Sequence, residues 1–251
     1  MIDENLVSVV MPAHDSGKFI FESINSVLVQ TYNYFELLVV DDGSTDDTAD
    51  IVNNITKTDS RVKYIKLKGT SGVVAARQKA IDVARGQYIA FLDSDDLWLP
   101  HKLEEQLKFM KDNESKISCT TYEQITEDGK RNGKKIVCPQ AINYNRILLD
   151  CPIGNLTVMI DRFYIPNITI PEVAKREDFA LWLSLTRKYG NIHGLNKILA
   201  LYRVRSGSVS RNKIALIPNQ WNVYRNVEHL GLCRSLFHVS YYCLIKLLKL
   251  K

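Results

Sequence analysis

The sequence predicts an α/β fold, built from helices packed on a mostly parallel sheet. In the N-terminal part, short β-rich apolar runs alternate with stretches of helical periodicity, and polar clusters follow three of these runs. Strands that alternate with helices of about 10–15 residues form parallel sheets with right-handed crossovers. Ligands bind such sheets beyond the carboxyl ends of the strands, so we expect the polar clusters to lie together on one edge.

The individual elements follow from local signals. Pro12 stops the first β-rich run, and Ser44 with Asp47 three residues later is a capping-box signature for the second helix. The expected strands cover 6–11, 35–40, 62–67 and 87–92, and the expected helices cover 18–30, 45–56 and 73–84. Beyond Pro100 we expect a helix at 101–112, a strand at 117–126, a turn at 127–130 and a short helix within 141–150. An irregular or short-stranded stretch should follow at 151–175, and then a helix at 177–189 that Gly190 closes. The last expected elements are a strand at 198–204, a loop at 205–210 and a helical tail from about 219.

Composition excludes several classes of protein. A chain of 251 residues with 45% hydrophobic and 24% charged residues is typical of a globular protein. The net charge of +5 is modest and concentrated toward the C-terminus, so we expect no nucleic-acid partner. The five cysteines are scattered without a Cys-x-x-Cys pair, which indicates neither a disulfide framework nor a zinc site and suits a reducing cytoplasm. We expect no signal peptide and, lacking about 18 uninterrupted apolar residues, no transmembrane helix.

The run Asp93-Ser94-Asp95-Asp96 is the most unusual stretch of the chain. Three carboxylates in four residues repel one another, and that repulsion is usually tolerated only where a cation or an array of hydrogen-bond donors binds. The alternative is a solvated turn before the next helix. The position of the run on the same expected sheet edge as Asp41 and Asp42 favours a site.

The pair Asp41-Asp42 ends the second expected strand. An Asp-Gly turn accounts for such residues without any function. The functional alternative is that one carboxylate accepts a hydrogen bond from a nucleobase N–H or a ribose hydroxyl. A receiver domain also places an acidic pair here, but residues 66–68 supply no aspartate at the end of the third strand.

Two further groups are candidates for chemistry. Arg77 lies one turn into the third helix among small residues, which suits either the approach of a diphosphate or a solvated helix face. Asp178 heads the apolar stripe of helix 177–189, so we expect it to point inward as a buried cap or a poised base, with Glu177 more peripheral. The sequence contains no Gly-x-Ser-x-Gly motif, no phosphate-binding glycine loop and no histidine pair at metal-ligand spacing.

Five ordered motifs resemble those of glycosyltransferase family 2, inverting enzymes of the GT-A fold. They cover 9–13, 38–46, 76–77, 86–96 and 176–182. The resemblance implies a Rossmann-like, three-layer α/β/α architecture with a mostly parallel central sheet. It divides the chain into a catalytic domain, 1–215, with a nucleotide-sugar-binding half at about 1–98 and an acceptor-binding half at about 99–215, and a C-terminal amphipathic helical tail, 216–251.

The resemblance also implies roles for individual residues. Asp41 or Asp42 would contact uracil, Asp93 the ribose, Asp95 a Mg²⁺ or Mn²⁺ ion on the donor diphosphate, and Asp178 would be the general base. These roles fit the chemistry of the reaction. The leaving diphosphate needs a cation, and the alcohol nucleophile needs a base within about 3 Å. The full implied set is Pro12, Ala13, His14, Asp41, Asp42, Arg77, Asp93 and Ser94 for the donor, Asp95 for the metal, Asp178 for catalysis, and Glu177, Trp182 and Arg203 as acceptor or supporting residues.

Two details refine the resemblance. The family often has Tyr-Asn after the first strand, where this chain has His14-Asp15. Tyr202-Arg203, followed by Ser-Gly-Ser at 206–208, is similar to the non-processive enzymes of bacterial O-antigen and capsule synthesis. The resemblance therefore implies transfer of one sugar from a nucleotide sugar, with UDP favoured, to a hydroxyl of a lipid-linked oligosaccharide.

The tail, 236–251, is apolar and aromatic and ends in lysines. It is too short and interrupted to span a bilayer, but it suits a helix lying in the interface of an anionic membrane. We therefore expect a cytoplasmic protein bound peripherally to the inner face of the cell membrane. The alternatives are a helix packed on the catalytic domain and a homodimer contact.

Two other functions stay open on the sequence. The first is an inactive nucleotide-sugar-binding subunit of a glycan-assembly complex, which would lack a base or a metal ligand. The second is a sugar nucleotidyltransferase, which would carry a glycine-rich, basic triphosphate loop near the first strand. Residues 12–18 are a poor version of such a loop.

Overall fold

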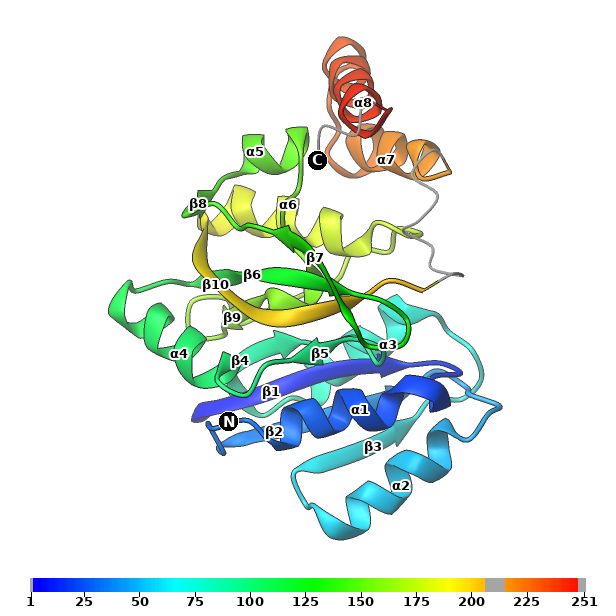
Figure 1. Ribbon diagram of the computed structural model, residues 1–251. Coiled ribbons are helices and arrows are strands. Elements are labelled where there is room, and N and C mark those ends of the chain that lie inside the picture. Colours follow the sequence, from blue (N-terminus) through cyan, green and yellow to red (C-terminus); the bar gives the residue numbers. More distant parts are fainter. Residues whose placement is uncertain (1, 206–214, 248–251) are drawn as a thin grey trace.

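One mixed sheet runs through the molecule, with helices on both of its faces (Figure 1). The computed structural model describes residues 2–205 and 215–247, and within them the sheet has ten strands. The strand order is β3-β2-β1-β4-β9-β6-β10-β5, with β7 paired to β6 and β8 paired to β10.

The elements follow one another in an order that begins with strict alternation of strand and helix. They are β1 (Asp3–Ala13), α1 (Gly17–Leu28), β2 (Phe35–Asp41), α2 (Thr48–Thr58), β3 (Val62–Lys66), α3 (Val73–Val83), β4 (Gly86–Phe91), β5 (Leu97–Trp98), α4 (Lys102–Asp112), β6 (Ile117–Ile125), β7 (Arg131–Ile136), β8 (Ala141–Ile142), α5 (Tyr144–Leu149), the 3₁₀-helix η1 (Asn155–Thr157), β9 (Met159–Asp161), α6 (Glu177–Tyr189), β10 (Ile192–Arg203), α7 (Ile217–Asn222), the π-helix η3 (Val223–Val227) and α8 (Leu232–Leu247).

The predicted parallel sheet is confirmed in β1 to β4. Strand β1 pairs in parallel with both β2 and β4, and β2 pairs in parallel with β3. Val10 of β1 lies opposite Leu38 on one side and Phe91 on the other, and all three are buried. Strands covered on both faces need continuous apolar runs, which is why these runs were readable in the sequence.

Two hydrophobic cores, one on each face, hold the layers together. Val7, Val9 and Met11 of β1 pack toward α1, α2 and α4, whereas Val10 packs with α3, α5 and α6. Successive side chains of a strand point to opposite faces, so one short run serves both cores. This is the expected three-layer α/β/α arrangement.

The second half of the sheet departs from the sequence prediction at several elements. The expected helix 141–150 is split into β8 and the short helix α5, and β10 begins at Ile192 rather than at 198. Strand β7 was not predicted, because its side chains are exposed or half-buried and polar, and it shows no hydrophobic alternation. Pairing with the partly buried β6 sets its conformation instead.

The predicted capping box at Ser44 is wrong. Helix α2 begins at Thr48, and Asp46 bonds both the backbone N–H and the hydroxyl of that residue. The Ser44 hydroxyl instead accepts a hydrogen bond from the backbone N–H of Asp15, 3.0 Å away. Ser44 therefore bonds to another loop instead of capping α2, and the local sequence does not reveal such a contact.

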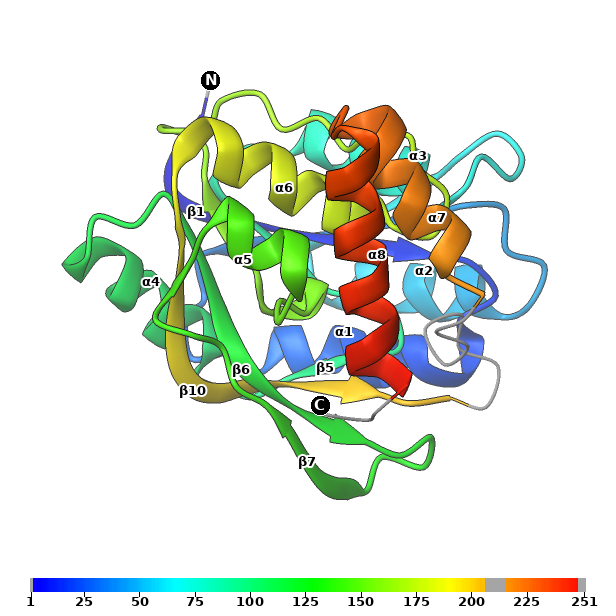
Figure 2. The same cartoon turned by 90° about the horizontal axis from the view of Figure 1, so that it is seen from above.

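The C-terminal helices form a layer over α5 and α6. Seen from above, α5, α6, α7 and α8 lie nearest the viewer, with the sheet beneath them (Figure 2). Part of the expected loop 205–210 and the terminal lysines of the tail lie outside the described residues. No helix in the described ranges is long and apolar enough to cross a membrane.

A buried lysine at the start of α4 gives the first prediction. Lys102 is fully buried, its Nζ lies 3.9 Å from the centre of the Trp98 ring, and burial lowers its pKa from 10.5 to about 7. Because the unfolded chain binds this proton up to pH 10.5 and the folded one does not, Lys102 destabilises the fold at neutral pH. We expect Lys102→Met to raise the free energy of unfolding at pH 7 by a few kcal/mol, since one pKa unit is about 1.4 kcal/mol.

The gain should shrink as the pH rises from 7 through 10.5, because the unfolded chain then loses the proton that the folded protein has already lost. Urea unfolding of both proteins across this pH range measures it. Lys108→Met, at an exposed position of the same helix, is the matched control and should change little. A gain from Lys102→Met that is constant with pH would contradict the assignment.

Candidate active site

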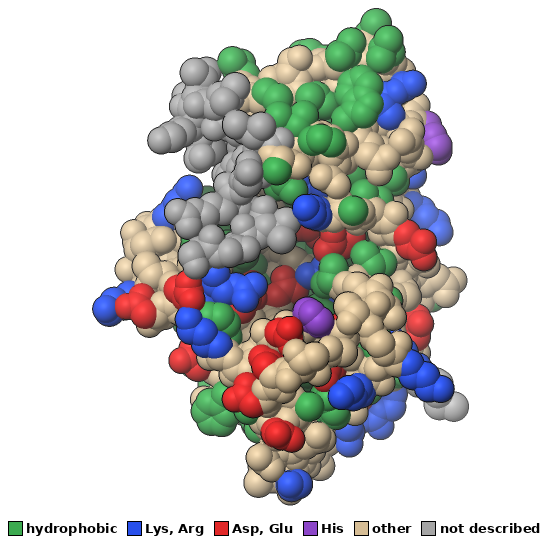
Figure 3. Space-filling view, turned by 90° about the vertical axis from the view of Figure 1, so that its right-hand side faces the viewer, with side chains coloured by type: hydrophobic (Ala, Val, Ile, Leu, Met, Phe, Trp, Pro, Cys, Tyr) green, Lys and Arg blue, Asp and Glu red, His purple; other side chains and the backbone are tan. Residues whose placement is uncertain are grey.

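The polar clusters that follow β1, β2 and β4 meet on one edge of the sheet, as expected. Ala13 at the end of β1 lies opposite Asp41 at the end of β2, and β4 ends at Phe91, two residues before Asp93. In the space-filling view, acidic side chains gather around a hollow in the middle of this face, with basic side chains beside it (Figure 3).

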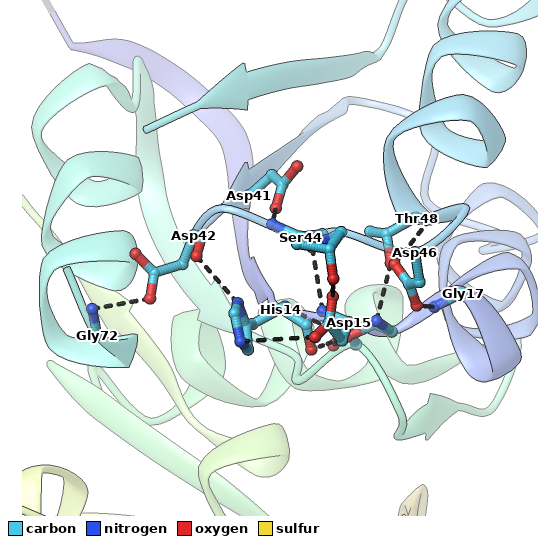
Figure 4. A network of polar contacts seen from close by, with 12 residues as sticks. His14, Asp15, Gly17, Asp41, Asp42, Ser44, Asp46, Thr48 and Gly72 are labelled. Carbon is cyan, nitrogen blue, oxygen red and sulfur yellow. Dashed lines mark hydrogen bonds and ion pairs between the residues drawn. The ribbon is translucent and has the colours of Figure 1, made fainter. Parts of the chain in front are cut away.

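The loop after β1 is fixed by the loop after β2 (Figure 4). The Asp42 N–H donates to the carbonyl of Ala13 at 2.8 Å, and His14 Nδ1 lies 2.9 Å from the carbonyl of Asp42. The backbone N–H groups of residues 14, 15, 16 and 17 all donate to side chains. Their acceptors are Ser16, Ser44, Thr48 and Asp46, respectively. The His14 ring stays about half exposed. Pro12, Ala13 and His14 therefore form a rigid wall of the site rather than a mobile loop.

The two carboxylates after β2 differ in their surroundings. Asp41 is fully buried and accepts from the backbone N–H of Ser44 at 2.8 Å and from the Tyr64 hydroxyl at 2.5 Å. Burial alone would raise the pKa of Asp41, but the hydrogen bonds from Ser44 and Tyr64 outweigh it and lower the pKa. Asp41 is thus an ionised, internally satisfied group.

Asp42 points away from Asp41, toward the beginning of α3 (Figure 4). Its carboxylate accepts from the backbone N–H groups of Ser71 and Gly72 at 2.6 and 2.7 Å. A carboxylate has about four acceptor positions, so two remain after these bonds. Both carboxylates of the pair are buried, Asp42 with 4% of its surface exposed and Asp41 with none.

Arg77 lies at the centre of the site. Its guanidinium is 8% exposed and pairs with Asp93 at 2.6 Å and with Glu177 at 3.0 Å. Burial disfavours its charge, but Asp93 and Glu177 more than compensate and raise the pKa of Arg77. The arginine therefore joins the end of β4 to the start of α6 as a permanent cation.

This ion pair reverses the expected order of burial in α6. The sequence predicted an inward Asp178 and a more peripheral Glu177, yet Glu177 is 9% exposed and Asp178 is only half-buried. The reason is Arg77, which comes from another element and therefore cannot be read from the α6 pattern. Burial, followed by the charge of Asp178, raises the pKa of Glu177.

The acidic run after β4 divides into residues that hold the turn and residues that face cations. Ser94 bonds the Ser16 hydroxyl at 2.7 Å, and Asp96, which is fully buried, accepts from the Arg203 N–H at 2.8 Å. Asp93 faces Arg77, and Asp95 forms an ion pair with Arg205, Nε to Oδ2, at 2.8 Å. The sequence reading did not single out Arg205 as a partner.

The surroundings of Asp95 fit a divalent cation. Burial, and then the charge of Asp93, raise the pKa of Asp95, whereas the charges of Arg205 and Arg203 act in the opposite direction, so positive charge beside this carboxylate stabilises its ionised form. Within 2–205 and 215–247 no group of three or more His, Cys, Asp and Glu could hold a metal alone. Mg²⁺ is commonly held by one or two carboxylates together with substrate phosphates, and Asp95 suits that form of site.

Asp178 lies at the beginning of α6, where its Oδ1 accepts from the next backbone N–H at 2.6 Å. Trp182, one turn on, is fully buried and packs edge-on against Phe91 with ring centres 5.8 Å apart. Arg203 is almost fully buried and bonds the Asp95 carbonyl and Glu22 at 2.8 and 2.7 Å. Trp182 and Arg203 therefore support the site through packing and hydrogen bonds.

Comparisons with known proteins agree with this geometry. Residues 8–164 match the model of the family described as Glycosyl transferase family 2. The chain is 40% identical over 230 residues to TuaG of Bacillus subtilis, a glycosyltransferase named for teichuronic acid biosynthesis, covering 92% of this chain and 91% of TuaG. It is 39% identical over 242 residues to WfgD of Escherichia coli, a UDP-Glc:α-D-GlcNAc-diphosphoundecaprenol β-1,3-glucosyltransferase, covering 96% and 93%.

Solved structures show the same fold. S. aureus TarS 1–349 in complex with UDP-GlcNAc superposes with a TM-score of 0.69 at 21% identity, covering 94% of this chain and 71% of that one. The mannosyltransferase PcManGT of Pyrobaculum calidifontis, in complex with GDP-Man and Mn²⁺, superposes with a TM-score of 0.64 at 16% identity, covering 94% and 69%. The predicted GT-A-like fold is thereby confirmed.

The buried ion pairs of Arg77 give the second prediction. Arg77→Met leaves Asp93 and Glu177 without their cation, and breaking a buried pair on one side costs about 3–5 kcal/mol. We expect a loss of that order in the free energy of unfolding, measured by urea denaturation at pH 7. Lys130→Met, which removes an exposed pair with Asp128, is the control and should cost about 0–1 kcal/mol. Equal losses in the two variants would contradict the buried role of Arg77.

Proposed function

The chain belongs to glycosyl transferase family 2, and from this premise we propose that it transfers one sugar, with inversion, from a UDP-sugar to a hydroxyl of a lipid-linked glycan in bacterial polysaccharide synthesis. One observation carries the proposal. Arg77 joins Asp93, at the sheet edge with Asp42 and Asp95, to Glu177, which directly precedes Asp178. The ion pairs of Arg77 thus hold two groups in a fixed relation to each other. One is Asp93, which suits contact with a nucleotide sugar, and the other is Asp178, which suits contact with an acceptor hydroxyl.

Each carboxylate takes a separate part in donor binding. Asp42 accepts from the uracil N–H with its remaining lone pairs, and Asp93 accepts from a ribose hydroxyl while Arg77 holds it in place. His14 lines the base pocket with its half-exposed ring. Asp95 would hold Mg²⁺ or Mn²⁺, which, when bound, neutralises charge that develops on the leaving diphosphate.

Asp178 acts on the acceptor. It takes the proton from the acceptor hydroxyl as that oxygen forms a bond to the anomeric carbon. The bond from the anomeric carbon to the diphosphate oxygen breaks, and its electron pair leaves with the UDP. Because the oxygen enters opposite the leaving group, one displacement inverts the anomeric centre and needs no enzyme nucleophile.

The loop after β1 argues against a nucleotidyltransferase. Such an enzyme needs backbone N–H groups that are free to bind a triphosphate. Here the N–H groups of residues 14–17 are all bonded to side chains of the protein. The presence of both Asp95 and Asp178 likewise favours an enzyme over an inactive subunit.

We further propose that α8 binds the inner face of the cell membrane. One face of this helix exposes Leu232, Leu236, Phe237 and Leu244, each at least half exposed. Hydrophobic side chains gather at the top of the molecule in Figure 3, the level at which α7 and α8 lie in Figure 1. An amphipathic helix with such a face binds in the headgroup region of a bilayer. A homodimer through the same face is the alternative.

The catalytic assignment is tested by two substitutions. We expect Asp95→Ala and Asp178→Asn each to lower kcat by roughly 10²–10⁴-fold, because the first removes the metal ligand and the second the base. Release of UDP from UDP-glucose with a synthetic α-GlcNAc-diphosphate lipid measures the rate. Asp112→Asn, at an exposed position of α4, is the control. Near-normal activity in a folded Asp95 or Asp178 variant would remove that residue from the mechanism.

Membrane binding is tested on the outer face of α8. We expect Leu236→Glu with Phe237→Glu to abolish sedimentation with vesicles that contain anionic lipid, since two charges enter the apolar face. Phe163→Glu, at a similarly exposed phenylalanine before α6, should leave sedimentation intact. Unchanged sedimentation of the α8 variant would contradict the proposal. A wild-type protein that does not bind vesicles, together with an α8 variant that changes from dimer to monomer, would also contradict it.

A further inference from the structure

A cavity of about 180 Å³ lies beneath the C-terminal helices, and most of its lining residues follow residue 164, where the match to the family model ends. Helices α5, α6, α7 and α8 surround it, and its walls include Cys151, Arg176, Phe179, Gln220, Tyr224 and Tyr242. Cavities of about 150 Å³ can accommodate a benzene ring. This one therefore has room for a single six-membered ring.

The cavity adjoins the proposed base. Arg176 and Phe179, which line it, flank the pair Glu177-Asp178 in the chain. Cys151, another wall residue, has its pKa raised to about 12 by burial, with a smaller contribution in the same direction from the charge of Asp178. The cavity therefore lies against the first turn of α6, the turn that carries Asp178.

The walls combine aromatic rings with polar groups. The Arg176 guanidinium lies over the rings of Phe179 and Tyr242, 5.7 and 5.3 Å from their centres, and donates to the Tyr242 hydroxyl at 2.9 Å. Flat aromatic faces next to hydrogen-bonding groups suit ligands that are apolar on one side and polar at the edge. A sugar ring has this character.

Gln220 supplies an unsatisfied acceptor. Its side chain is only 2% exposed, and its Oε1 has no hydrogen-bond partner among the described residues. Its amide interacts with the Tyr224 hydroxyl, which itself donates to the Leu148 carbonyl at 2.7 Å. Buried polar atoms without a partner are rare and unfavourable, so a donor from a ligand is expected at Oε1.

We propose that this cavity binds the terminal sugar residue of the acceptor and presents one of its hydroxyls to Asp178. The aromatic walls contact the face of the ring, and Gln220 Oε1 accepts from a hydroxyl or acetamido N–H of the sugar. This inference rests on the proposed function and names the residues by which the acceptor is recognised. Helix α8 gives one wall of the cavity through Tyr242 and exposes its apolar face outward, so a lipid-linked acceptor can reach the cavity from the surface that the helix binds.

The test separates acceptor binding from donor binding. The probe is α-GlcNAc-diphosphate on a short alkyl chain, titrated by calorimetry into the full chain in the presence of UDP and Mn²⁺. We expect Gln220→Leu to weaken binding of this probe, and to raise its KM, by roughly tenfold, because a buried hydrogen bond is lost. Binding of UDP alone and kcat at saturating acceptor should stay at the wild-type level.

Two further variants complete the design. Tyr242→Phe keeps the ring and removes the hydroxyl that orients Arg176, and we expect a smaller rise in acceptor KM, so it serves even if Gln220→Leu is poorly folded. Asn226→Ala, at an exposed position just after α7, is the control. An unchanged KM for the probe in the folded Gln220 or Tyr242 variant overturns the cavity assignment, as does a wild-type protein that does not bind the probe. If Asp178→Asn loses transfer while Gln220→Leu keeps the wild-type KM for the probe, the proposed function still holds and the cavity assignment is wrong.

Discussion

The buried guanidinium of Arg77 is the constraint on which the arrangement of the site depends. Its partners, Asp93 and Glu177, lie 16 and 100 residues further along the chain, in the loop after β4 and at the start of α6. Without a cation between them, two partly buried carboxylates would repel each other, and the start of α6 would lose its anchor to the loop after β4. Because Asp178 follows Glu177 directly, the same ion pair fixes the proposed base relative to the proposed donor site.

The site that results is rich in acceptors and poor in free donors. The backbone N–H groups of the 14–17 loop are bonded internally, and Asp42, Asp93 and Asp95 present carboxylates. Such a surface recognises the N–H and O–H groups of a nucleoside but repels its diphosphate. Added positive charge would therefore favour the binding of a diphosphate here. The ion pair between Asp95 and Arg205 shows that this location already accommodates a cation.

The sequence was informative where one segment determines its own structure. The β-rich runs of β1, β2 and β4 are buried on both faces, so their alternation with helical stretches predicted the parallel sheet and the edge on which Asp41, Asp42 and Asp93 meet. The sequence prediction failed where a residue distant in the chain determines the local structure. Ser44 lost its expected cap role to the Asp15 N–H, and Glu177 became the buried residue of its pair because Arg77 lies opposite. Strand β7 has no apolar pattern at all and exists through pairing with β6.

The C-terminal helices complete a division of labour along the chain. The match to the family model ends at residue 164, and α6, α7 and α8, which follow it, enclose the cavity together with α5. Helix α8 contributes buried Tyr242 and His238 on one side and exposed Leu236 and Phe237 on the other. A helix that only covered the core would gain nothing from the exposed pair. Under the two proposals, a helix that brings a lipid-borne sugar to Asp178 needs both faces, and acceptor recognition and membrane contact would then belong to the same element.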